Sequence, residues 1–62
     1  MQGKKLTTEF GDVVQVTISP WEAAILLASL NRVPIGDTAI VLDTNKVEVA
    51  RVLRDFHKEV GS

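Results

Sequence analysis

The sequence predicts a small α+β domain, in which an N-terminal strand or hairpin precedes two helices and a short extra strand lies between them. Residues 13–18 alternate like a half-buried strand, and segments 19–31 and 45–60 begin with capping residues and repeat apolar residues at helical spacing. The 62 residues contain no cysteine and one histidine, so neither disulfides nor a zinc site can reinforce a small core. We therefore expect a homo-oligomer.

The N-terminal part is expected to start with a polar lead-in over residues 1–5. Segment 6–10 alternates, with Leu6, Thr8 and Phe10 on one face, and is expected to pair with 13–18 as a hairpin. The turn signal between them is Gly11-Asp12. Within 13–18 the two faces of the strand differ: the face expected against the core carries Val14, Val16 and Ile18, and the other carries Val13, Gln15 and Thr17.

The first helix is predicted from a capping box. Ser19 and Glu22 are spaced so that each side chain can bond the backbone N–H of the other, and Pro20 suits the first helical position. The rest of the helix is apolar nearly all round, which is typical of a helix that is covered on both sides. A chain of this length has little else to cover it, so we expect the helix at the oligomer interface, through Ile25, Leu26, Leu27 and Leu30.

The remainder is expected to contain a connector, a short strand and a second helix. Asn31 suits a left-handed C-cap, and Pro34 prevents the helix from continuing. Residues 38–42 fit either a short buried strand parallel to 13–18 or an extended segment packed on the first helix, and we favour the strand. Asn45 and Glu48 form a second capping box. The core stripe of the second helix is expected to be Val49, Leu53, Phe56 and Val60, widened by Val52 and Ala50.

Composition argues against several classes of protein. The net charge of −1 gives no broad electrostatic footprint for nucleic acid, although a local basic patch remains compatible with it. The apolar run of the first helix is too short to span a bilayer, and no basic leader precedes an apolar stretch. No spacing of acidic, serine or histidine residues indicates a catalytic group. We expect a protein without enzymatic activity, cofactor or metal, and we expect it in the cytoplasm, with which the absence of cysteine is compatible.

The candidate ligand-binding residues lie on the second helix and beside its start. Arg51, Arg54 and Lys58 share the side opposite the core stripe, with Val47 among them. They form either a solvated face of weak ion pairs or an anion-binding stripe. The free N–H groups at the helix start add a second anion candidate, and Trp21 could stack on a base from the first helix. The full set is Thr44, Asn45, Lys46, Arg51, Arg54, Lys58 and Trp21.

Two resemblances bear on function. Residues 26–36, which read Leu-Leu-Ala-Ser-Leu-Asn-Arg-Val-Pro-Ile-Gly, followed by residues 49–54, resemble small uncharacterised phage accessory proteins. In those, a leucine-rich helix leads through a Pro-Ile-Gly-type turn into a second helix. The resemblance implies a helical hairpin in a small oligomer and a setting in phage–host conflict or lysogeny. It also implies that a cyclic nucleotide signal can be held at subunit interfaces, as in oligomeric sponges that inhibit host defence.

The second resemblance is to ribbon-helix-helix repressors. Residues 14–20 read like the strand and first helix start of that family, with Gln15 and Thr17 as the residues that would contact DNA. The connector over 33–44 is longer than the tight turn of the family, and the strand offers no basic side chain. The favoured function is therefore a homo-oligomeric binding protein that sequesters a nucleotide-like anion or blocks a host protein. A DNA-binding repressor is the alternative, and a structural assembly subunit is the third.

Overall fold

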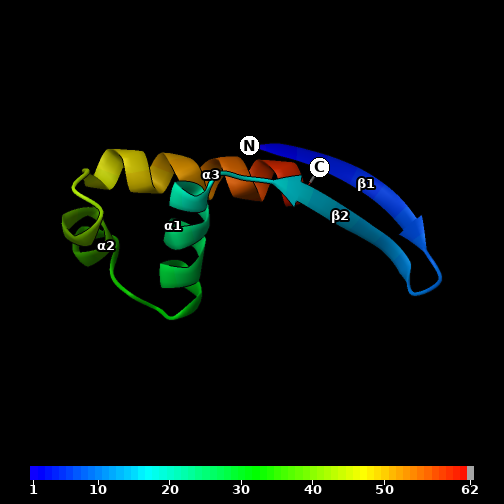
Figure 1. The fold of residues 1–62 in the computed structure, drawn as a ribbon, viewed down its shortest axis with the longest axis horizontal. Helices are drawn as coiled ribbons and strands as arrows, with labels where there is room; N and C mark the ends of the chain where they lie inside the picture. Colours follow the sequence, from blue (N-terminus) through cyan, green and yellow to red (C-terminus); the bar gives the residue numbers. More distant parts are fainter. Residues whose placement is uncertain (62) are drawn as a thin grey trace.

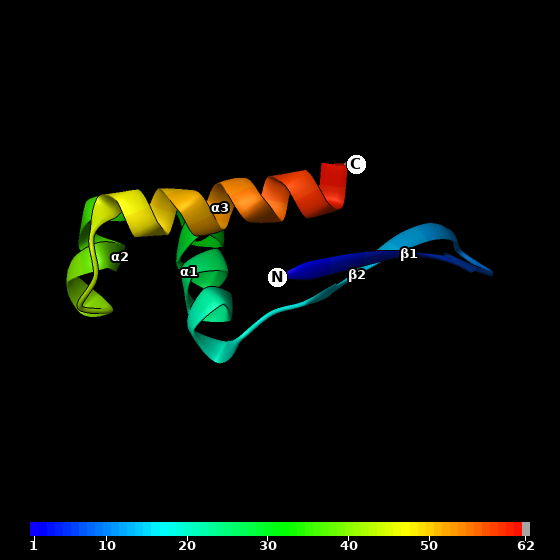
Figure 2. The same ribbon diagram turned by 90° about the horizontal axis from the view of Figure 1, so that it is seen from above.

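The computed structural model describes residues 1–61 as a hairpin followed by three helices (Figure 1). The elements are β1 (Gln2–Thr8), β2 (Gly11–Thr17), α1 (Pro20–Leu30), α2 (Ile35–Val41) and α3 (Lys46–Gly61). The predicted α+β class with an N-terminal hairpin is confirmed. The molecule measures 40 × 18 × 18 Å, because the hairpin projects from one end of the helical part instead of folding over it (Figures 1 and 2).

The hairpin turn lies two residues earlier than predicted. Residues 9–10 form the turn, and Gly11 pairs with Thr8 as the first residue of β2. The Thr8 hydroxyl closes the turn: it accepts from the N–H of Phe10 at 3.2 Å and donates to the carbonyl of Gly11 at 2.9 Å. Gly11 has a φ of 105°, which a side chain would oppose. The predicted lead-in over residues 1–5 is therefore wrong, since most of it belongs to β1, and Phe10 lies at the tip, 89% exposed.

The alternation of β2 is confirmed. Val14, Val16 and Ile18 are half-buried, whereas Gln15 and Thr17 are exposed. The hairpin meets α3 at Gly3, whose N–H donates to a carboxylate oxygen of Glu59 at 2.9 Å. A Cβ atom at Gly3 would lie 3.1 Å from the Glu59 carbonyl oxygen, so the lack of a side chain permits this close approach.

Helix α1 begins as predicted and ends differently. The Ser19 N–H donates to the Glu22 carboxylate at 2.9 Å, and the Glu22 N–H donates to the Ser19 hydroxyl at 3.2 Å, so the capping box is confirmed. The left-handed residue after the helix is Arg32, with φ 59°, and not Asn31. Asn31 keeps a φ of −84° because its side-chain amide donates to the Leu27 carbonyl at 3.0 Å and extends the helical pattern.

The favoured strand over residues 38–42 is wrong, because this segment belongs to the helix α2. Pro34 stands at its N-cap, and the Pro34 carbonyl accepts from the backbone N–H of Thr38 at 3.1 Å. The Thr38 hydroxyl donates to the same carbonyl at 3.3 Å, which allows this polar side chain to be buried. Thr38, Ala39 and Leu42 share one side of α2, at spacings of one and three residues, and that side packs inwards.

The core contains one or two side chains from each helix. Ile25 of α1, Ala39 of α2, and Val49 and Val52 of α3 are buried, and Met1, Leu42 and Leu53 pack against them. The predicted stripe of α3 is thus shifted towards Val52. Phe56 is half-buried and Val60 is 43% exposed, because α3 extends beyond α1 and α2 at its C-terminal end (Figure 1). None of the helices in residues 1–61 has the length and hydrophobicity needed to cross a bilayer.

Candidate functional site

The segment that joins α2 to α3 is a short turn held by backbone hydrogen bonds. It consists of the four residues Leu42–Asn45. Asp43 adopts the left-handed conformation, with φ 53°, and its N–H donates to the Ile40 carbonyl at 3.2 Å. The Thr44 N–H donates to the Ala39 carbonyl at 2.8 Å. These two bonds form a Schellman motif, so the chain leaves α2 in a fixed direction.

The two helices cross instead of lying alongside one another. Figure 2 shows α1 and α2 on the same side of α3, with α3 running across both. Ala39 lies in the buried side of α2 together with Thr38, and its small side chain allows the backbone of α3 to come close. Two crossing helices that are joined by a turn of three or four residues form a helix-turn-helix unit. Helix α1 completes a three-helix core around it.

The outer face of α3 is uncovered by the rest of the described chain. We use the name "outer face" for Val47, Arg51, Arg54 and Lys58, which are all exposed and lie opposite the buried Val49 and Val52. The elements α1 and α2 lie on the other side of the helix (Figure 2). The grouping of the three basic residues that the sequence indicates is therefore present in the fold, on the uncovered side of α3.

The charges of the outer face are only partly neutralised. Arg51 donates to the Glu48 carboxylate at 2.8 Å and to the Asp55 carboxylate at 3.4 Å. The hydrogen bond from Arg51 lowers the pKa of Glu48. Within residues 1–61, Arg54 and Lys58 have no ion-pair partner. Exposed pairs such as those of Arg51 are weak, so the guanidinium can exchange its partners for an external anion at small cost.

The start of α3 adjoins the outer face. The Asn45 side-chain oxygen accepts from the Glu48 N–H at 3.0 Å, which confirms half of the predicted second capping box. The Glu48 carboxylate bonds to Arg51 instead of completing it. Lys46 is exposed and Thr44 is half-buried. The predicted residues at the helix start thus lie beside the outer face, and the Lys46 side chain lies towards Gly36 of α2.

Three other predicted residues lie apart from that surface. Trp21 is in the first turn of α1, which packs on the opposite side of α3 (Figure 2). Gln15 and Thr17 are on β2, and their partners in the hairpin are Lys4 and Gln2. In the ribbon-helix-helix arrangement one strand is followed by two helices. Here β2 pairs with β1 of its own chain, and three helices follow within residues 1–61, so the arrangement differs.

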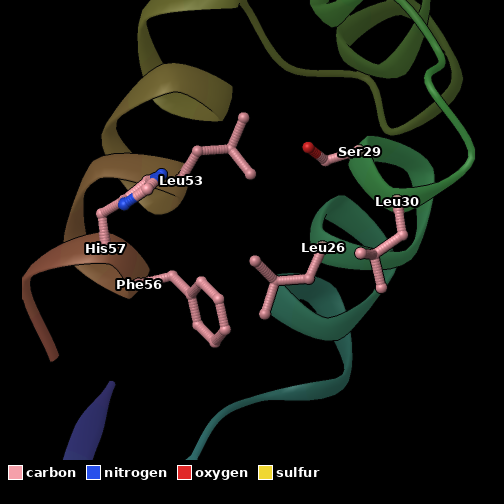
Figure 3. Close-up of a pocket in the computed structure, with 6 residues that line it drawn as sticks. All are labelled: Leu26, Ser29, Leu30, Leu53, Phe56 and His57. Atoms are coloured by element: carbon pink, nitrogen blue, oxygen red, sulfur yellow. The ribbon is translucent and has the colours of Figure 1, made fainter. Parts of the chain in front are cut away.

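Two hollows lie between the helices. The larger, about 350 Å³, is between α1 and α3 (Figure 3). The smaller, about 230 Å³, is between α1 and α2. The larger is lined by Leu26, Ser29, Leu30, Leu53, Phe56 and His57, and the smaller by Ala24, Ala28, Val33, Thr38, Val41 and Leu42. Neither is lined by a residue of the predicted ligand-binding set.

The residues predicted at an oligomer interface separate into two groups. Ile25 is fully buried within one chain, so its side chain is not available to a second subunit. Leu27 and Leu30 are exposed, and Leu26 is half-buried beside them. The interface prediction for these three leucines stays a prediction.

Comparison of the chain with protein-family models, curated proteins and solved structures gives no match. Among residues 1–61, no three histidine, aspartate or glutamate side chains are grouped so that they could hold a metal ion. The function must therefore be inferred from the geometry of the helices.

Sequence reasoning missed the helix-turn-helix because it missed α2. The β-branched and aliphatic run over 38–42 resembles a buried strand in composition. A helical signal was present in the spacing of Thr38, Ala39 and Leu42, which places all three on one side of a helix. With seven residues, α2 is too short for that periodicity to be distinctive.

Proposed function

We propose that this protein binds double-stranded DNA and inserts α3 into the major groove. The observation that carries the proposal is the helix-turn-helix of α2 and α3, in which the second helix presents an uncovered outer face with three basic residues. In helix-turn-helix proteins the second helix occupies the major groove and the first crosses the backbone. The side of α3 away from α1 and α2 is free to do so (Figure 2).

The side chains on this surface suit such a contact. An arginine can donate two hydrogen bonds to the O6 and N7 atoms of guanine, and Arg54 has no ion pair to break within residues 1–61. Val47 is 74% exposed, and an aliphatic side chain can contact the methyl group of thymine. Lys58, near the C-terminal end of the helix, is exposed on the outer face, and a lysine there suits a contact to a phosphate.

The net charge of −1 sets the conditions under which binding is expected. A neutral or acidic protein gains little long-range attraction to DNA, so affinity must come from the local basic residues on α3. The three acidic residues of that helix, Glu48, Asp55 and Glu59, lie on a neighbouring side and not on the outer face. We therefore expect weak nonspecific binding, and a preferred sequence that binds more tightly.

The test begins with selection from a pool of randomised duplexes at low salt, followed by fluorescence anisotropy with the enriched duplex. Arg54→Ala is expected to weaken binding by roughly 1–3 kcal/mol if the guanidinium contacts a base, which is about 5- to 150-fold in Kd. If it contacts a phosphate instead, the loss is similar for all duplexes, and the slope of log K against log salt falls by about 1.

The matched control is Lys4→Ala, which removes the same charge from the hairpin and not from α3. With anisotropy measured at about 0.1 M salt, it should change Kd by less than about twofold, because surface charges beyond a Debye length of roughly 10 Å are then screened. Absence of binding by the wild type to any duplex at low salt would refute the proposal. Equal losses in the two variants would show that the outer face is not the contact surface.

A mononucleotide or cyclic nucleotide is the second ligand proposed for the same basic residues. The position of the site favours DNA, since neither hollow is lined by those residues and a small ligand would have no pocket there. Titration calorimetry with linear and cyclic nucleotides separates the two proposals. Tight nucleotide binding that is lost in the double variant Arg51→Ala/Arg54→Ala, together with no duplex binding, would favour sequestration. The setting in phage lysogeny or host conflict stays a prediction from the sequence resemblance.

A further inference from the structure

An apolar surface extends from α1 across the larger hollow to α3. We call it the leucine face, and it comprises Leu26, Leu27, Leu30, Leu53 and Phe56. Figure 3 shows Leu26 and Phe56 pointing towards each other across the hollow. Leu30, at its edge, is 79% exposed. Leu26, Leu53 and Phe56 are half-buried, whereas Leu27 and Leu30 stay exposed in residues 1–61, although leucine is a residue type that folding normally buries.

The distribution of polar groups on α1 shows that its apolar side is turned outwards. The only charged side chain of α1 is Glu22, which is engaged by Ser19 and by the N-terminal amine of Met1, at 3.9 Å. A helix of a monomeric domain usually turns its polar residues to solvent. Here Leu27 and Leu30 occupy that position instead, so the surface requires a further apolar layer.

We propose that a second copy of this chain covers the leucine face, in a two-fold symmetric dimer. A two-fold interface brings the same surface of both copies together, so any charge at its centre meets a like charge. The residues that line the hollow include no aspartate, glutamate, lysine or arginine, which suits self-association. The face is also self-complementary, because Leu30 protrudes beside a hollow of about 350 Å³ that can receive the same side chain from the partner.

The dimer does not rest on the proposed DNA binding. The outer face of α3 is opposite the side that packs on α1, so both outer faces stay accessible when the leucine faces are joined.

The first experiment measures mass by sedimentation equilibrium over a range of concentrations from micromolar upwards. The wild type is expected to reach twice the chain mass of 6.8 kDa. Leu30→Lys should stay at the monomer mass and keep the helix content of the wild type, because Leu30 contributes little to the core of one chain. The matched control is Ile40→Lys on α2, a residue with 78% exposure that lies outside the leucine face and that should still dimerise.

A second measurement does not depend on any variant remaining folded. In a mixture of isotope-labelled and unlabelled wild-type protein, filtered NOE spectra should show contacts from the Leu30 methyl groups of one copy to the Phe56 ring of the other. A wild type that stays monomeric at all concentrations would overturn the proposal, whether or not it binds DNA. The assignment to the leucine face would be overturned if Ile40→Lys dissociated the dimer and Leu30→Lys did not. It would also be overturned if the dimer gave none of these NOEs.

Discussion

The side chain of Val52 provides the most direct test of the three-helix core that orients the helix-turn-helix. Val52 is 1% exposed and belongs to the cluster in which α3 meets Ile25 of α1 and Ala39 of α2. Replacing it with alanine removes two carbon atoms from this cluster. With so few fully buried side chains, neighbouring residues have little scope to fill the space, and a cavity is expected to remain.

The magnitude follows from the burial. Loss of two buried carbon atoms costs about 1.6 kcal/mol in transfer free energy, and the cavity raises the total to roughly 2–3 kcal/mol. The entropy of unfolding of a chain of this length is about 0.13 kcal/mol per kelvin, so the melting temperature of Val52→Ala should fall by about 15–23 °C. The free energy of unfolding of such a domain is only about 3–9 kcal/mol, which makes this a large fraction.

Thermal unfolding followed by circular dichroism measures the effect. All variants should be compared at one protein concentration, since association makes the melting temperature depend on concentration. The control is Val47→Ala, the same substitution on the same helix at a position that is 74% exposed, and we expect a change within about 0.5 kcal/mol. Equal melting temperatures for the two variants would refute the packing of α3 described here.

The remaining predictions concern the helix starts. Ser19→Ala and Asn45→Ala should each reduce the free energy of unfolding by about 1 kcal/mol, measured by urea titration. An unchanged free energy of unfolding would show that these side chains do not cap the helices. The Ser19 N–H lowers the pKa of Glu22, so its stabilisation is present above the ordinary pKa of 4.5 and is lost as pH falls through the lowered value. Glu22→Gln should therefore lose less stability than the wild type on acidification below about pH 4.5; identical pH profiles would contradict this assignment.

The local features of this protein could be predicted from the sequence because each depends on neighbouring residues. The Ser19–Glu22 box, the Asn45 cap and the alternation of β2 involve groups a few residues apart, so the residue types are sufficient to indicate them. The basic group on the outer face of α3 follows from helical spacing alone. The hairpin turn was misplaced by two residues, because the Thr8 hydroxyl, and not the Gly11-Asp12 pair, closes it.

Only the tertiary structure decided the features that depend on distant contacts. Residues 38–42 have the composition of a strand, but as a helix they bury Thr38 and Ala39, and Ala39 joins Val49 and Val52 of α3 in the core. That choice creates the helix-turn-helix and leaves the basic residues of α3 on its uncovered outer face. Likewise, the all-round apolar α1 divides into Ile25, which the chain itself buries, and Leu30, which it leaves exposed. Sequence periodicity cannot separate the two, because the division is set by the side on which α3 packs.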